Sequence, residues 1–324
     1  MAPPPLHDYA STMKVTSPAP ADTVSADLAA LMKIRNLELR ARAVVDGYYQ
    51  GLHRSPRHGF SAEFAEYSAY VPGDDIRYLD WKVLARRDKT FIRKFRDETN
   101  LQCTLLLDLS RSMSYGHQRY TKLEYARTLA ATLAVFLHQQ GDAIGLMLYD
   151  DEPRDFLPPR HRRSHLHAIL TALSRPAEGT SAALGAPVEA ILGRGRMRGL
   201  MCVISDFLTP LESLNAPLSS LAACGHEVAL LQTLDPVEIH FDFDQPTNLE
   251  DLESGQILPA DSASMREGYL KRFQAHQSGL KALCDQLGMM HYLVPTDQAL
   301  ESVLHTYLAD RRALGRRIVR ANRF

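Results

Sequence analysis

Two aspartates and three hydroxyl residues in this sequence have the chemistry and the spacing to hold a metal ion. Asp108, Ser110 and Ser112 alternate in the segment DLSRSMSYG, directly after the apolar run LQCTLLL. Asp206 ends a second apolar run, CVISD, and Thr180 lies between the two runs in the loop EGTS. All five offer hard oxygen atoms, which are the ligands that Mg²⁺ prefers in proteins. The set predicts a divalent-cation site if the fold brings the three segments together.

The order of apolar runs indicates how these segments are positioned. Strand-like runs LQCTLLLD, AIGLMLYD, GLMCVISD, HEVALLQTLD and MHYLVPTD alternate with helical segments such as TKLEYARTLAATLAVFLHQQ. Such alternation is typical of a Rossmann-like α/β fold, with a mostly parallel sheet flanked by helices. Ligands of an open parallel sheet bind beyond the carboxyl ends of its strands, where the strand order reverses. Asp108 and Asp206 both end such runs, so we expect them to meet at that edge.

Composition divides the chain into three parts. Residues 1–22 are rich in Pro, Ala, Ser and Thr and are predicted to be disordered. Residues 23–100 form an N-terminal extension with an amphipathic helix and a segment dense in aromatic and charged residues, and residues 101–324 form the α/β domain. We expect Tyr78 and Trp81 to pack the extension onto the core. The acidic residues beside them could instead form a separate site.

Charge, apolar runs and cysteines narrow the classes of function. The 37 basic and 38 acidic residues give a formal net charge of -1, so nucleic-acid binding would need a local basic patch. The longest apolar helical stretch, LAATLAVFL, is too short to span a bilayer, and the N-terminus lacks the apolar core of a signal peptide. The four cysteines are widely separated, which is typical of free thiols in a reducing compartment. We expect a cytoplasmic protein with no nucleic-acid partner and no membrane insertion.

Over about residues 101–310, the chain resembles von Willebrand factor A (vWA) domains with their metal-ion-dependent adhesion site. The residues that carry this resemblance are, in order, Asp108, Ser110, Ser112, Thr180 and Asp206. The resemblance implies that the hydroxyl residues contact the ion directly and that the two aspartates act largely through water. Neutral hydroxyl ligands leave the charge of Mg²⁺, or of Mn²⁺ or Ca²⁺ in its place, only partly balanced, so we expect an acidic residue of a partner protein to complete the coordination.

One position departs from the vWA pattern. Many vWA domains have two glycines before the threonine, whereas this chain has Glu178 and Gly179. Glu178 either adds negative charge near the ion or points to solvent. The sequence therefore leaves the affinity of the site and its choice of metal open.

A second resemblance, to the DUF58 family, extends over most of the chain. It is carried by YVPGDDIRYLDWKVLARRDKTFIRKFRDE before the first strand, and by TLDPVEIHF followed by LEDLESGQ. Members of that family carry a vWA-like domain and are similar to factors that work beside MoxR-type AAA+ ATPases. The resemblance implies a non-enzymatic, metal-dependent adaptor or scaffold with such an ATPase as its partner.

Two other interpretations use the same residues. A Mg²⁺-dependent phosphohydrolase on a Rossmann-like sheet would use Asp108 as its nucleophile. That chemistry needs a second acid two residues later, where this chain has Ser110. The other alternative is a purely structural vWA-like domain without an ion, in which Thr180 and Asp206 only cap helices. Phosphate release would identify the enzyme, and a metal titration would decide between the two non-enzymatic functions.

Overall fold

The computed structural model describes eleven parts of the chain, which are residues 26–54, 66–69, 91–94, 101–117, 119–176, 179, 182–194, 198–242, 247–250, 257–260 and 262–321. The chain divides into two compact units. One consists of Met1–Tyr48 with Leu101–Phe324, and the other is Tyr49–Asn100. In the smaller unit, strands β1 (Glu66–Ala69) and β2 (Phe91–Lys94) pair antiparallel. The disorder predicted for the N-terminus and the packing predicted for Tyr78 and Trp81 lie outside the described residues.

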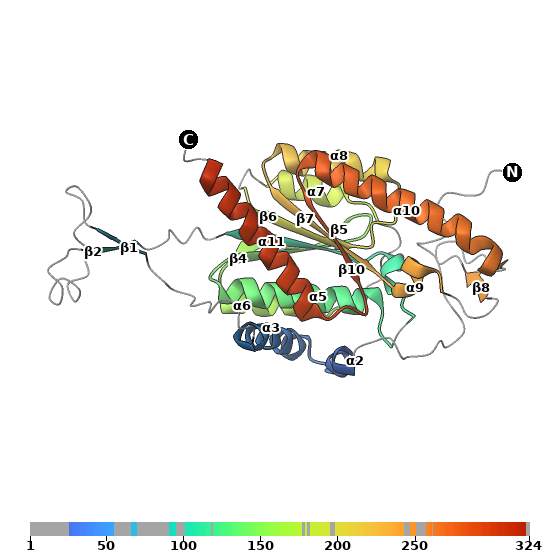
Figure 1. Cartoon of the computed structure of the whole chain (residues 1–324), viewed down its shortest axis with the longest axis horizontal. Helices are drawn as coiled ribbons and strands as arrows, with labels where there is room; N and C mark the ends of the chain where they lie inside the picture. The colour runs from blue at the N-terminus through green and yellow to red at the C-terminus, as the bar shows by residue number, and fades with distance from the viewer. Residues whose placement is uncertain are drawn as a thin grey trace. The chain divides into compact units, whose positions relative to one another are not determined.

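A six-stranded sheet forms the centre of the larger unit (Figure 1). Its strands, in spatial order, are β10 (Met290–Pro295), β7 (Glu227–Leu234), β6 (Leu200–Ser205), β3 (Gln102–Asp108), β4 (Ala143–Tyr149) and β5 (Pro153–Arg160). All neighbours pair parallel except β4 and β5. Numbered along the chain and read from β5, the order is 3-2-1-4-5-6, that of Rossmann-type sheets. The predicted fold class, a mostly parallel α/β sheet, is confirmed.

Helices cover both faces of this sheet (Figure 1). One face carries α7 (Gly185–Leu192), α8 (Leu211–Ala223) and α10 (Ser262–Leu287), and the other carries α5 (Lys122–Gln139), α6 (Arg163–Leu173) and α11 (Leu300–Ala321). The inner strands are therefore buried on both sides, which explains why they read as unbroken apolar runs in the sequence. Helix α5 begins with a capping box in which Thr121 and Glu124 each accept the other's backbone N–H.

One N-terminal helix, and the first part of a second up to Tyr48, belong to the same compact unit as the sheet. These are α2 (Ala26–Met32) and α3 (Leu37–Arg54). Arg40 of α3 donates from Nη1 to Thr128 Oγ1 of α5 at 3.0 Å. The rings of Tyr48 and Phe136 meet edge to face, with centroids 5.6 Å apart. The first part of the predicted extension, up to Tyr48, is thus continuous with the core.

The carboxyl edge of the sheet carries two short elements that approach the candidate site. A 3₁₀ turn, η2 (Arg111–Ser114), follows β3, and a short helix, α9 (Pro236–His240), follows β7. Strands β8 (Thr247–Glu250) and β9 (Ile257–Ala260) form a separate antiparallel pair. None of the helices in the described ranges combines the length and the apolar character needed to cross a lipid bilayer.

Truncation of Tyr48 tests the docking of α3. Its side chain is 5% exposed, so Tyr48→Ala should lower the free energy of unfolding by about 3 kcal/mol, the usual loss for a buried aromatic. Leu39 lies on the same helix and is 58% exposed, so Leu39→Ala should change the free energy of unfolding by less than about 0.5 kcal/mol. Urea denaturation followed by circular dichroism measures both. Equal, small effects would contradict the docking.

Candidate functional site

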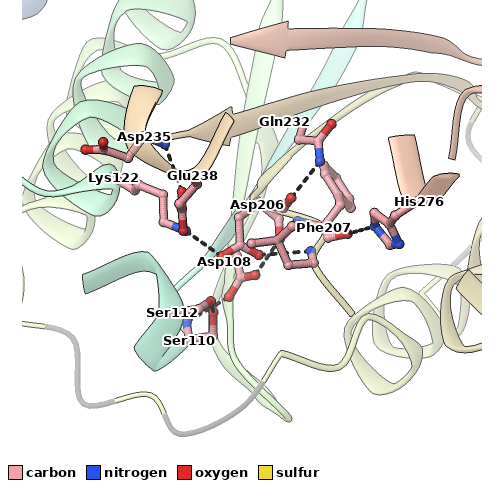
Figure 2. Close-up of polar contacts among 12 residues, drawn as sticks. Asp108, Ser110, Ser112, Lys122, Asp206, Phe207, Gln232, Asp235, Glu238 and His276 are labelled. Atoms are coloured by element: carbon pink, nitrogen blue, oxygen red, sulfur yellow. Dashed lines mark hydrogen bonds and ion pairs between the residues drawn. The ribbon is translucent and has the colours of Figure 1, made fainter. Parts of the chain in front are cut away.

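Four of the five predicted ligands meet at the carboxyl edge of the sheet (Figure 2). Asp108 is the last residue of β3 and Asp206 directly follows β6. These two strands are neighbours at the sheet centre, and the strand order reverses between them. Ser110 and Ser112 lie in the turn after β3, and all four residues are buried. Thr180 lies outside the described residues.

The carboxylate of Asp108 is held by neutral donors. Its Oδ1 accepts the backbone N–H of Ser110 at 2.7 Å, and its Oδ2 accepts the hydroxyl of Ser205 at 2.6 Å. Within the described residues, no basic side chain forms an ion pair with Asp108. Burial, reinforced by the nearby carboxylate of Asp206, raises the pKa of Asp108 to about 7. A cation placed beside this carboxylate would relieve both effects.

The hydroxyls of Ser110 and Ser112 face each other, with 3.1 Å between their oxygen atoms. In a near-octahedral Mg²⁺ shell, with Mg–O distances of about 2.0–2.1 Å, adjacent ligand oxygens lie about 3 Å apart. The two hydroxyls therefore have the spacing of neighbouring ligands. The described residues contain no group of three or more His, Cys, Asp or Glu that could hold a metal. The donor set therefore fits a hard cation only if the hydroxyls take part as ligands.

A buried lysine joins Asp206 to a third carboxylate, that of Glu238. The Nζ atom of Lys122 donates to Asp206 Oδ2 at 2.9 Å and to Glu238 Oε1 at 2.7 Å. Burial alone would raise the pKa of Asp206, but the Lys122 ammonium reverses that effect and holds the pKa below its ordinary value. Burial outweighs the same ammonium at Glu238, where it raises the pKa to about 7. The two aspartates of the site therefore differ in their charge compensation.

Neither Lys122 nor Glu238 was identified in the sequence as part of the site. Each nevertheless has a local sequence feature that could have indicated it. Lys122 is the first residue of α5, where the helix dipole disfavours a cation, so its position needs a compensating partner. Glu238 completes a capping box with Asp235 at the start of α9, and its Oε2 accepts the Asp235 N–H at 2.9 Å. The capping box leaves Oε1 of Glu238 for Lys122.

The backbone after Asp206 turns sharply at Phe207. Its φ of 51° lies in the left-handed region, which a bulky residue rarely adopts. The Phe207 N–H donates to Ser205 Oγ at 3.2 Å, and its carbonyl accepts from His276 Nε2 of α10 at 2.7 Å (Figure 2). Gln232 Nε2 donates to the carbonyl of Asp206 at 2.9 Å. These contacts hold the strained turn, a feature often concentrated at functional sites.

The loop before Thr180 comes into contact with the turn after β3. A Cβ atom on Gly179 would lie 2.1 Å from the carbonyl oxygen of Leu109 and 3.2 Å from Cβ of Asp150. On the other side of Thr180, the N–H of Ala183 donates to the Asp150 carbonyl at 3.0 Å. The backbone on each side of Thr180 is therefore tied to the ends of β3 and β4. Only glycine fits the closest point of this approach.

Comparison with known proteins adds a family and several remote structural likenesses. The family described as "Protein of unknown function DUF58" matches residues 66–279. The uncharacterized protein Rv1480 of Mycobacterium tuberculosis is 27% identical over 283 residues, which cover 86% of this chain and 89% of that protein. An aerotolerance-related membrane protein from Bacteroides fragilis has 16% identity and a TM-score of 0.42, covering 64% of this chain and 97% of that one. The VWA domain of SpRpn10 has 11% identity and a TM-score of 0.37, and the likeness covers 64% of this chain and 94% of that domain.

Substitution of Gly179 tests the approach of the loop. Gly179→Ala places a methyl group against the Leu109 backbone, which cannot move as a side chain would, so it should lower the free energy of unfolding by about 1–3 kcal/mol. Gly185, at the start of α7, has no atom within 4 Å of a built Cβ. Gly185→Ala should therefore leave stability unchanged or raise it by up to about 1 kcal/mol. Thermal unfolding compares the two, and equal stabilities would show that the loop is not so constrained.

Proposed function

The chain belongs to the DUF58 family, and on that premise we propose that it is a non-enzymatic adaptor that recognises a protein through a bound divalent cation. One observation carries the proposal. Two buried carboxylates end neighbouring strands at the reversal of strand order, and two hydroxyls stand 3.1 Å apart beside them. This is the position at which open α/β sheets bind their ligands.

Residues of three segments would hold the ion. Ser110, Ser112 and Thr180 would contact it through their hydroxyls, and Asp108 and Asp206 would act largely through water, as the vWA resemblance implies. Mg²⁺ fits the donor set, with Mn²⁺ or Ca²⁺ as substitutes. When bound, the ion supplies an electrophilic centre that an acidic side chain of a partner can coordinate.

The hydroxyl ligands explain why the partner should be acidic. Hydroxyls supply oxygen without charge, so the ion's positive charge is only partly balanced by the protein. A Glu or Asp from a partner supplies both a ligand and the missing charge, and charge-assisted contacts of this kind are the stronger ones. A MoxR-type AAA+ ATPase is the partner that the DUF58 resemblance implies, and we include it in the proposal.

The alternative function, a Mg²⁺-dependent phosphohydrolase, receives less support from the geometry. A nucleophilic carboxylate needs an oxygen that faces its substrate, whereas both oxygens of Asp108 accept hydrogen bonds and the side chain is fully buried. The residue two positions later is Ser110, which cannot serve as the general acid. Both features disfavour Asp108 as the nucleophile of a hydrolase.

Metal binding is the first test of the proposal. Saturating Mn²⁺ or Mg²⁺ should raise the melting temperature, because a ligand at 100 times its Kd stabilises the native state by about 2.7 kcal/mol. Asp108→Asn should abolish the rise. Asp285→Asn, at an exposed acid of α10, should retain it. Differential scanning fluorimetry with and without EDTA measures the shift, and an equal rise in Asp108→Asn would place the ion elsewhere.

Partner binding is the second test. A purified MoxR-type ATPase from the same genome should bind the immobilised protein in Mg²⁺ and lose at least tenfold in affinity in EDTA, because the ion bridges the two proteins. Ser112→Ala should cause a similar loss in Mg²⁺, since it removes one hydroxyl ligand, while Ser220→Ala, at an exposed position of α8, should bind normally. Biolayer interferometry gives the affinities.

Two outcomes of the partner experiment would contradict parts of the proposal. Binding that survives both EDTA and Ser112→Ala would rule out a metal bridge. Absence of binding under every condition would rule out this class of partner. Release of phosphate from p-nitrophenyl phosphate that depends on Asp108 would instead support the hydrolase.

A further inference from the structure

Lys122 contacts the candidate site without being one of its ligands. Its side chain is fully buried, and those of Asp206 and Glu238 are only 2% and 1% exposed. Its Nζ atom also lies 5.8 Å from the ring centre of Tyr115. Buried ion pairs are often no more stabilising than apolar residues of similar volume, because desolvation offsets their attraction. Stability alone therefore gives a weak reason for this lysine.

The charges at this edge of the sheet are unevenly distributed. Asp108 and Asp206 lie at the carboxyl ends of the paired strands β3 and β6, and both are buried, so each carboxylate disfavours the charge of the other. Lys122 contacts Asp206, whereas Asp108 is held by the hydroxyl of Ser205 and the N–H of Ser110. One aspartate of the pair thus has a built-in counter-charge and the other has none among the described residues.

From this asymmetry we propose that Lys122 is a positioning residue that limits the negative charge offered to the ion. It occupies one oxygen of Asp206 and compensates its charge, and Glu238 holds the ammonium in place from the other side (Figure 2). The inference rests on the proposed function. It adds that the site is tuned for weak, reversible metal binding, and that the bound ion keeps the positive charge which attracts an acidic partner.

Removal of the ammonium should therefore tighten metal binding. A unit charge in contact with a ligand carboxylate opposes a dication strongly in a protein environment, so its loss should lower the Kd for Mn²⁺ about tenfold or more. The metal-free protein should melt at a lower temperature, because Asp206 would lose its partner. The rise in melting temperature caused by Mn²⁺ should increase correspondingly.

The variants must distinguish the effect of removing the positive charge from the effect of destabilising the fold. Lys122→Met alone leaves two buried carboxylates unpaired, which endangers the fold. In the double variant Lys122→Met, Glu238→Gln, Asp206 is the one carboxylate that loses its counter-charge, and the glutamine can still accept the N–H of Asp235. Glu238→Gln alone is the matched control, because it keeps the ammonium. Lys281→Met removes a positive charge at an exposed position of α10, and it controls for net charge.

Isothermal titration calorimetry with Mn²⁺ gives the Kd of each variant, and thermal unfolding shows whether each variant is folded. The inference is supported if the double variant binds Mn²⁺ at least tenfold more tightly than Glu238→Gln while Lys281→Met matches the wild type. An unchanged Kd would overturn it and leave Lys122 with a structural role. A higher Kd would also overturn the inference, since Lys122 would then be needed to hold Asp206 for the ion.

Two further outcomes remain informative. If the double variant is unfolded without metal, Mn²⁺ should restore its circular dichroism spectrum, and failure to do so would overturn the inference. If the wild type and all variants fail to bind Mn²⁺, the proposed function itself is wrong. Loss of the proposed function is therefore distinguishable from loss of the role given to Lys122.

Discussion

Two carboxylates buried side by side are the constraint on which this edge of the sheet depends. Asp108 and Asp206 end neighbouring parallel strands, and the low polarity of their surroundings makes two adjacent negative charges costly. The protein meets that cost in two different ways. Asp206 receives the ammonium of Lys122, whereas Asp108 receives neutral donors and has its pKa raised to about 7. Asp108 is therefore the carboxylate of the pair that has no positive partner among the described residues.

The same network joins the site to helices on different parts of the sheet. Lys122 comes from the first turn of α5, and Glu238 comes from α9. Two side chains of helix α10 also contact this region. The hydroxyl of Tyr269 donates to the backbone carbonyl of Glu238 at 2.8 Å, and Nε2 of His276 donates to the backbone carbonyl of Phe207 at 2.7 Å. The geometry of the site is therefore set by tertiary contacts as much as by the loops that carry its ligands.

The sequence allowed the fold to be predicted and indicated candidate residues at one edge of the sheet, but it did not reveal the charge network. Strands buried on both faces leave continuous apolar runs, and the Asp108-x-Ser110-x-Ser112 spacing is local, so both can be read directly. Lys122 and Glu238 lie 116 residues apart, and only folding brings them together. The positive φ of Phe207 also has no local signature, since neighbouring contacts impose it. The predictions for Thr180 and Trp81 stay predictions, because both lie outside the described residues.

The unequal treatment of the two aspartates also bears on the choice of metal. Ca²⁺ takes six to eight oxygen ligands in a flexible shell, whereas Mg²⁺ takes six at short distances and usually keeps several waters. Here one oxygen of Asp206 is engaged by Lys122, and both oxygens of Asp108 already accept hydrogen bonds. Few carboxylate oxygens are left for a large shell, and the two serine hydroxyls stand 3.1 Å apart, a separation that suits a small ion. For the ion that we propose, this arrangement favours Mg²⁺ or Mn²⁺ over Ca²⁺.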